Sequence, residues 1–258
     1  MAPLAAADDR NHSRSRDLRI VLRDLRGPRE RARLLTRLIG SRFGLGRGPI
    51  RLRFRDFEAE FELSQGEISP YAQVAMDVEA GVIPDRTEAR GWTVLDCGAN
   101  VGLFSLFLKD AERIVAVEPN PDVCARLRRN LDANGVDATV IESAVSDLDG
   151  TVKMDFGGPS VLSGIGASGS DVRCASLDAL LEETGIGSVD LLKLDVEGHE
   201  IEALNGGAGA LGGGRIRRIV AEFGDRDALA ALDAHLLPLG FERAATGAIN
   251  ARFDLQSG

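Results

Sequence analysis

Short apolar runs alternate with amphipathic segments along the C-terminal two thirds of the chain. The runs predict strands at 92–96, 113–118, 138–145, 189–197 and 216–223, and the segments between them predict helices from about residue 102, over 121–134 and over 199–210. Strands that alternate with helices are typical of right-handed βαβ crossovers. We therefore predict an α/β fold with a doubly wound, mostly parallel sheet, whose ligands bind at the carboxyl ends of the strands.

The first ninety residues follow a different pattern. Apolar residues at helical spacing predict two short helices within 18–40, broken at Gly27-Pro28, and strict alternation over 50–63 predicts a hairpin with one buried face. A further helix is expected over 68–84. The predicted division is an N-terminal helical cap and β-hairpin at 1–90 and a cofactor-binding domain at 91–258. Within that domain, the Gly/Ser-rich stretch 151–177 predicts a small strand pair around a loop of the kind that often covers a substrate.

Charge is unevenly distributed along the chain. Residues 1–55 contain 15 arginines and five acidic residues, a charge of +10. Because the net charge of the chain is −9, the other 203 residues carry −19. A basic arm can bind nucleic acid or a membrane surface. The interpretation we favour is that the basic head packs on the acidic body of the same or a neighbouring subunit, and that nucleic acid and membranes are not partners. An apolar, arginine-rich head followed by an exposed hairpin makes a homodimer an expectation.

Composition is that of an ordinary soluble globular protein, with 44% hydrophobic residues. There is no apolar run of about 18 residues, and the opening residues carry acids where a signal peptide needs its apolar segment, so a cytoplasmic location is expected. The three cysteines have no CxxC spacing, which predicts reduced, buried thiols.

The stretch VLDCGANVGLFS at 94–105 points to a nucleotide-type cofactor. A glycine-rich turn between a strand and a helix lets a ligand approach backbone N–H groups. The three-glycine pattern of a nicotinamide site is absent, because Asn100 stands between Gly98 and Gly102. Glu118, at the end of the second strand, is placed to accept both ribose hydroxyls, whereas Asp96 would repel a pyrophosphate. A cationic cofactor without phosphate, S-adenosylmethionine, fits these acids best.

A second group of acids follows the fourth predicted strand, in the sequence KLDVEGHE. The first and fourth strands of the predicted sheet are expected to be neighbours, so Asp195, Glu197 and His199 should lie beside the glycine turn. His199 is a candidate general base, with Asp195 or Glu197 as alternatives. Glu222, at the end of the next strand, needs a donor or a cation, and Asp195 with Glu222 holding a divalent ion such as Mg²⁺ is a further alternative.

These motifs, in order over residues 92–225, resemble the FkbM family of S-adenosylmethionine-dependent methyltransferases: DCGANVG (96–102), VAVEPNPD (115–122), CASLDALL (174–181), VDLLKLDVEGHE (189–200) and IVAEF (219–223). The resemblance implies that Asp195 and Glu197 face the reaction site. It also implies cofactor contacts at Asp96, Gly98, Asn100, Gly102 and Glu118, with Ser143 and Ala144 lining the adenine.

The same resemblance implies methyl transfer to a small molecule, most often at a hydroxyl of a sugar or natural-product scaffold. Methylation of an amine, or of RNA guided by the arginine-rich head, is the alternative. A non-catalytic adenosine-ligand binder is a third class, which would be expected to lack the acids at 195–200.

Overall fold

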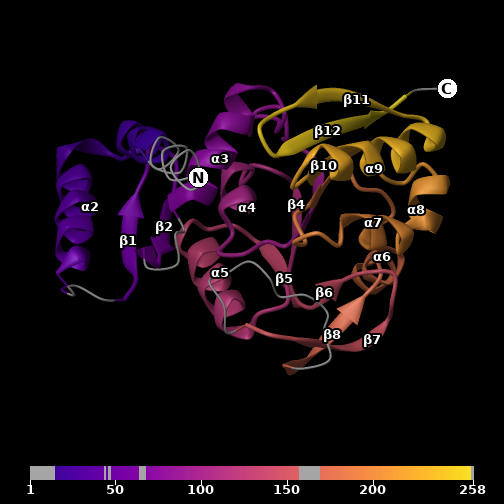
Figure 1. Ribbon diagram of the computed structural model, residues 1–258, viewed down its shortest axis with the longest axis horizontal. Helices are drawn as coiled ribbons and strands as arrows, with labels where there is room; N and C mark the ends of the chain where they lie inside the picture. The colour runs from indigo at the N-terminus through magenta and orange to yellow at the C-terminus, as the bar shows by residue number, and fades with distance from the viewer. Residues whose placement is uncertain (1–14, 44, 46–47, 64–67, 157–168, 257–258) are drawn as a thin grey trace, which may run out of the picture. The chain divides into compact units, whose positions relative to one another are not determined.

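A computed structural model describes residues 15–43, 45, 48–63, 68–156 and 169–256 of the chain (Figure 1). The chain forms two compact units, residues 1–76 and 77–258. The helix α3 (Ile68–Glu79) runs across this division. The sequence placed the boundary at 90/91, where the first strand of the large sheet is about to begin.

The first unit contains the predicted helix pair and hairpin. Residues 15–24 are helical, and the break falls at Leu25-Arg26, two residues before the predicted position. Gly27, at φ +85°, and Pro28 instead form the start of α2 (Gly27–Arg42). Strands β1 (Ile50–Arg53) and β2 (Glu58–Phe61) are antiparallel, and their alternate residues are buried, as predicted. Phe54 stacks on Tyr71 with ring centroids 4.1 Å apart, so aromatic packing joins the hairpin to α3.

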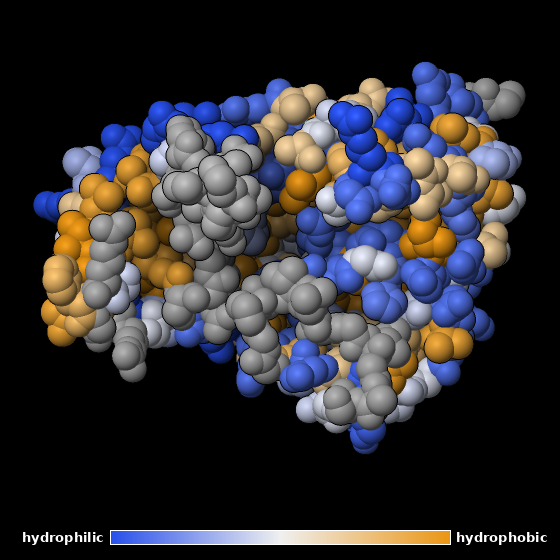
Figure 2. Space-filling view, viewed as in Figure 1, coloured by the Kyte–Doolittle hydropathy of each residue, from blue (hydrophilic) through white to orange (hydrophobic). Residues whose placement is uncertain are grey.

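One side of α2 is apolar and exposed. Leu35, Ile39 and Phe43 are spaced four residues apart, and with Leu45 they are 40–76% exposed. Apolar residues gather over α2 at the left edge of Figure 2. The homodimer expected from this head stays a prediction.

The second unit is built on a seven-stranded sheet within the described residues, in the order β11-β12-β10-β9-β3-β4-β5. Its central strand β3 (Thr93–Cys97) pairs in parallel with β4 (Arg113–Glu118) and β9 (Leu191–Leu194). Outward from these lie the parallel strands β5 (Ala138–Glu142) and β10 (Arg218–Glu222), and the antiparallel β12 (Asn250–Leu255) and β11 (Phe241–Thr246). The chain reverses its direction of winding between β3 and β9, which places the ligand edge at their carboxyl ends. The doubly wound, mostly parallel α/β fold is confirmed.

Helices cover both faces of this sheet (Figure 1). They are α4 (Leu103–Phe107), α5 (Pro121–Ala133), α6 (Leu177–Thr184), α7 (Glu200–Asn205), α8 (Ala208–Gly212), α9 (Arg226–Leu236) and the 3₁₀ turn η2 (Leu237–Leu239). Side-chain oxygens of Asn120, Ser176 and Asp225 accept backbone N–H bonds at the starts of α5, α6 and α9. Such caps satisfy donors that the helix itself leaves unpaired.

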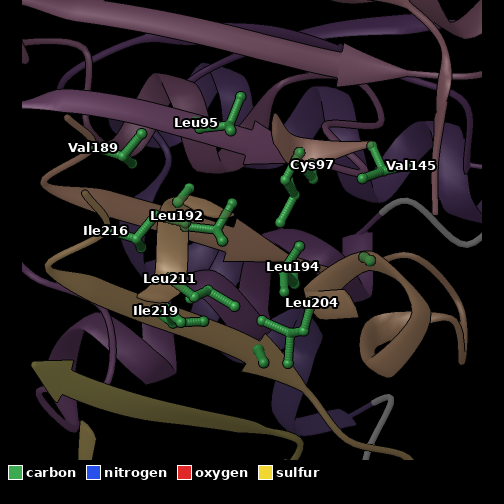
Figure 3. Close-up of a cluster of buried hydrophobic side chains, with 14 of the residues drawn as sticks. Leu95, Cys97, Val145, Val189, Leu192, Leu194, Leu204, Leu211, Ile216 and Ile219 are labelled. Atoms are coloured by element: carbon green, nitrogen blue, oxygen red, sulfur yellow. The ribbon is translucent and has the colours of Figure 1, made fainter. Parts of the chain in front are cut away.

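The main core lies against one face of the central strands. Leu95 and Cys97 of β3 point to the same side as Leu192 and Leu194 of β9, where they meet Leu204 and Leu211 from the helices (Figure 3). Because side chains alternate along a strand, the residues between them point to the opposite face. Asp96 and Lys193 are those residues, and they are direct cross-strand partners.

A three-stranded sheet accompanies the large one within the described residues, in the order β6-β8-β7. The strands β7 (Gly150–Met154) and β8 (Ser170–Ala175) are antiparallel, which confirms the predicted strand pair, and β8 also pairs with β6 (Ala144–Val145). The loop expected to cover a substrate falls at 157–168, outside the described residues.

The single helix predicted over 199–210 is two helices, α7 and α8, separated at Gly206-Gly207. A Cβ at Gly206 would lie 2.2 Å from the carbonyl oxygen of Ser146, so close backbone packing requires glycine and interrupts the helix there. All three cysteines are free and buried, as predicted. Among the described residues, no helix combines the length and the apolar character that crossing a membrane requires.

Candidate active site

The turn after β3 is hydrogen-bonded to the end of the neighbouring strand β4. The N–H groups of Gly98 and Ala99 donate to the carbonyl oxygen of Val117 at 2.9 and 3.0 Å. Gly98, Asn100 and Gly102 all have left-handed backbone, with φ of +76°, +49° and +88°. Glycine adopts this region without strain, whereas Asn100 tolerates it as one of the less penalised side chains.

The space that a side chain would need at the two glycines is filled by the protein. A Cβ at Gly98 would lie 1.7 Å from the carbonyl oxygen of Asp195, and one at Gly102 would lie 2.6 Å from Cδ1 of Leu127 in α5. The sequence interpretation attributed both glycines to the approach of a ligand. In the structure Gly98 lets the turn pack against the end of β9, and Gly102 lets α4 begin against α5. Their predicted cofactor contacts stay predictions.

Glu118 is the best-defined candidate for a cofactor contact. It is 8% exposed, and each carboxylate oxygen accepts one backbone N–H, from Asn100 and from Asn120, both at 3.0 Å. Burial raises the pKa of Glu118, while these two hydrogen bonds oppose the rise. A carboxylate oxygen has two lone pairs, so each retains one for a ligand. The side chain thus fixes the glycine turn and the start of α5 while it can still accept two adjacent hydroxyls.

Asp96 is buried and paired inside the protein, and its predicted cofactor contact stays a prediction. Its side chain is fully buried, Oδ2 accepts a hydrogen bond from Ser105 Oγ at 2.7 Å, and Oδ1 lies 3.3 Å from Nζ of Lys193. The sequence interpretation placed this carboxylate against the cofactor. The structure places it inside the protein, where it balances the charge of Lys193.

Lys193 was missed by sequence reasoning. Its buried ammonium lies 2.6 Å from the carbonyl oxygen of Gly98 and 3.2 Å from Oδ2 of Asp195, in addition to its contact with Asp96. Burial lowers the pKa of Lys193, but the charges of Asp195 and Asp96 outweigh this and leave the pKa above its usual value. The available signal was a lysine between leucines in a fully buried strand, since a buried lysine is rare unless it is paired.

Asp195 and Glu222 form a carboxyl pair at the ends of neighbouring strands. Their side chains are hydrogen-bonded to each other. Burial would raise the pKa of Asp195, but the Lys193 ammonium and hydrogen bonds from Glu222 and Lys193 hold it below its usual value. Burial and the neighbouring Asp195 raise the pKa of Glu222 to about 9. Within the pair, Asp195 is therefore the member that favours its ionised form and Glu222 the member that favours its protonated form.

The turn after Asp195 carries the other predicted catalytic groups. Glu197 and Gly198 have φ of +58° and +89°, and the buried Glu200 holds this turn by accepting the N–H groups of Val196 and Gly198 at 3.1 and 3.3 Å. Glu197 is exposed, and desolvation together with the charges of Asp195 and Glu200 raises its pKa to about 7. A left-handed non-glycine residue is a strained conformation that often marks a functional turn.

His199 stands directly before α7 and is half-buried. Its imidazole makes no hydrogen bond or ion pair with the part of the chain that the structure describes. Ser143 follows β5 and is fully buried, with its hydroxyl donating to the carbonyl oxygens of Ala144 and Arg173. Ala144 packs with Met154, Val172 and Cys174 in the core of the small sheet. The adenine-lining role of both stays a prediction.

Asp195 and Glu222 were the predicted ligands of a divalent cation. Asp195 instead pairs with the Lys193 ammonium, at 3.2 Å. No group of three or more His, Cys, Asp or Glu among the described residues is arranged to hold an ion. The predicted magnesium site is therefore not supported by these residues.

Sheet order, glycine turn and the acid at the end of β4 together define a Rossmann-like fold of the methyltransferase type. The model of the family described as the methyltransferase FkbM domain matches residues 96–242, and the chain belongs to this family.

Two relatives are similar over part of their length. The chain is 32% identical over 175 residues to the 31-O-demethyl-FK506 methyltransferase FkbM of Streptomyces tacrolimicus, a match that covers 53% of this chain and 67% of that protein. It is 30% identical over 122 residues to the hexuronic acid methyltransferase AglP of Haloferax volcanii, which covers 45% of this chain and half of AglP. Among solved structures, magnesium protoporphyrin IX methyltransferase from Synechocystis is similar with a TM-score of 0.48 and 16% identity, over 74% of this chain and 83% of that one.

Proposed function

We propose that the protein is an S-adenosylmethionine-dependent methyltransferase that acts on a hydroxyl group of a small molecule, such as a sugar or a natural-product scaffold. The observation that carries the proposal is the position of Glu118 and the glycine turn at the same sheet edge as the Asp195–Glu222 pair. The relatives FkbM and AglP are named for an FK506 precursor and for hexuronic acid, which supports a small-molecule acceptor.

The residues at this edge suit a cofactor with a ribose and positive charge. Glu118 keeps two lone pairs for neighbouring ribose hydroxyls, in addition to the two backbone N–H groups that it already accepts. Asp195, Glu197 and Glu222 surround the same edge, and the cation among them, Lys193, is already paired with carboxylates. Such a site suits the sulfonium and ammonium groups of S-adenosylmethionine and disfavours a pyrophosphate.

When bound, the cofactor supplies an electrophilic methyl group. An alcohol must lose its proton as its oxygen is methylated, and a positioned base typically accelerates such a step by about 10²–10⁴-fold. Asp195 is ionised, partly exposed and held by Lys193 and Glu222, so it can accept the hydrogen bond that orients the hydroxyl. Glu197, with a pKa of about 7, is suited to take up the proton, and His199 is the alternative base two residues further on.

Cofactor binding and turnover test this proposal. S-adenosylmethionine or S-adenosylhomocysteine should raise the melting temperature, and NAD should not. Asp195→Asn keeps the shape of the side chain and removes its charge, so turnover should fall by at least about 100-fold with a smaller effect on cofactor affinity. Full activity of Asp195→Asn would remove this residue from catalysis. Methyl transfer to RNA, with RNA retained on a filter at about 150 mM salt, would instead favour an RNA-modifying enzyme.

A further inference from the structure

Lys193 joins three structural parts through a single ammonium group. Lysine is rare in this chain, at three of the 31 basic residues, and the other two, Lys109 and Lys153, each pair with an acid outside the central sheet. The Lys193 ammonium instead lies within 3.3 Å of three oxygens, Asp96 Oδ1, the Gly98 carbonyl and Asp195 Oδ2. A lysine ammonium is a compact charge with its N–H donors on one atom, so it can donate to the Gly98 carbonyl and pair with two carboxylates at once, whereas the planar fork of arginine holds its donors in a fixed geometry.

Each of the three oxygens belongs to a different part of the site. Asp96 lies in β3 directly opposite Lys193 and accepts a hydrogen bond from the Ser105 hydroxyl. Gly98 belongs to the turn in which the N–H of Asn100 donates to Glu118. Asp195 begins the turn that carries Glu197 and is bonded to Glu222. The ammonium therefore connects the cofactor side of the edge to its acid side.

We propose that Lys193 is a positioning residue for methyl transfer, which fixes the glycine turn through the Gly98 carbonyl and keeps Asp195 the charged member of the Asp195–Glu222 pair. This inference rests on the proposed function of the site.

Stability alone does not explain a charged group at this position. Replacing a buried ion pair with apolar residues of similar volume is often neutral or stabilising, because the desolvation of both charges is avoided. The neighbouring carboxyl groups depend on the ammonium electrostatically. Burial raises the pKa of Glu118, Glu197 and Glu222, and the charge of Lys193 opposes the rise in each case. Without the Lys193 ammonium, more of these carboxyl groups would be protonated at neutral pH, and fewer could accept a proton from the substrate.

Lys193→Met tests both parts of the proposal, each with its own measurement. It keeps the length of the side chain and removes the charge, so Asp195 should lose the neighbour that favours its ionised form. An opposite charge at this range lowers a carboxyl pKa by about 1–3 units, and the titration midpoint of Asp195 should rise by a similar amount. Affinity for S-adenosylhomocysteine should fall by about tenfold, the lower bound for a lost hydrogen bond to a charged group, because the turn is released.

The first measurement needs no cofactor and no acceptor. Carboxyl ¹³C NMR of the cofactor-free full chain, with the Asp195 resonance assigned by its loss in Asp195→Asn, gives the midpoint directly. Lys109→Met is the matched control, since it removes a lysine that pairs with Asp110 just after the end of α4. Lys193→Arg should return the Asp195 midpoint toward that of the wild type, because charge is restored. The same variant should still bind S-adenosylhomocysteine weakly, because its fork cannot serve all three oxygens.

A double-mutant cycle then tests whether Lys193 acts through Asp195. At saturating S-adenosylmethionine, where the loss of cofactor affinity no longer limits the rate, Lys193→Met in an Asp195→Asn background should change turnover by less than about threefold, because both changes remove the Lys193–Asp195 interaction. Independent losses that multiply, or an Asp195 midpoint in Lys193→Met that equals that of Lys109→Met, would overturn the proposal. So would failure of both Lys193 variants to fold while Lys109→Met folds, since Lys193 would then serve the fold.

The role of Lys193 and the function of the site can be refuted separately. If the wild type binds S-adenosylmethionine and transfers methyl groups while Lys193→Met matches it in affinity and in the Asp195 midpoint, only the role of Lys193 is wrong. If the wild type binds neither S-adenosylmethionine nor S-adenosylhomocysteine, the proposed function is wrong and this inference falls with it.

Discussion

Gly98→Ala tests whether the glycine turn is required by packing within the protein itself. The new Cβ would lie 1.7 Å from the carbonyl oxygen of Asp195 and 2.8 Å from its carbonyl carbon, so the first contact must lengthen to at least 3.0 Å. Both sides of the contact are backbone, and the N–H of Asp195 is bonded to the Cys97 carbonyl at 3.1 Å, so neither side can rotate away.

Gly185→Ala is the control that isolates this clash. Gly185 is also left-handed, with φ +64°, but a Cβ there meets nothing within 4 Å. Left-handed backbone alone costs a non-glycine residue about 1–2 kcal/mol. Gly98→Ala should cost about 1–3 kcal/mol more, the usual range for overpacking. For a unit of this size, that difference lowers the melting temperature by roughly a further 2–12 °C.

Urea unfolding followed by tryptophan fluorescence gives the free energy of unfolding of each variant, because the single tryptophan, Trp92, lies directly before β3 in the same unit. Gly98→Ala should also lose affinity for S-adenosylhomocysteine, whereas Gly185→Ala should not. Free energies of unfolding within about 0.5 kcal/mol of each other would refute the packing explanation, since that is the scatter expected between unrelated surface changes.

Two further predictions concern the carboxyl groups of the site. Glu118→Ala should weaken S-adenosylhomocysteine binding by roughly 10- to 150-fold, since it removes charge-assisted hydrogen bonds worth about 1.5–3 kcal/mol; unchanged affinity by calorimetry would remove the ribose assignment. Glu222→Gln should make stability less dependent on pH. The pKa of Glu222 is raised from 4.5 to about 9 in the folded protein, so the folded state binds the extra proton and the wild type loses stability as pH rises through this window. The prediction would be contradicted if the melting temperatures of the wild type and Glu222→Gln, measured at pH 5, 7 and 9, changed with pH by the same amount.

Elements with a strong local pattern could be predicted from the sequence. The apolar runs of β3, β4, β9 and β10 and the helix over 121–134 lie where periodicity placed them, because burial on both faces of a central strand leaves a continuous apolar run. The break at Gly206 was missed because its cause is a contact with Ser146, sixty residues earlier in the chain, which no local pattern records.

The site could be predicted only in part. Motif spacing placed Glu118, Asp195, Glu197 and Glu222 at one sheet edge, because parallel strands end together. The functions of Asp96 and Lys193 depend on the pairing of β3 with β9, which a linear pattern does not specify. The packing at the two glycines could not be read from the sequence, because the Asp195 carbonyl that approaches Gly98 and the Leu127 side chain that approaches Gly102 come from other elements of the fold.

The pairing of Asp96 with Lys193 also has a consequence for how the sheet assembles. The two residues are opposite each other in the middle of adjacent parallel strands, and their neighbours Leu95, Cys97, Leu192 and Leu194 point to the other face. A slip of one residue would turn one charged side chain into the apolar core and leave its partner alone on the opposite face. An unpaired buried charge costs several kcal/mol, so misaligned sheets are strongly disfavoured. The Asp96–Lys193 ion pair is therefore complete only in the native alignment of the two central strands.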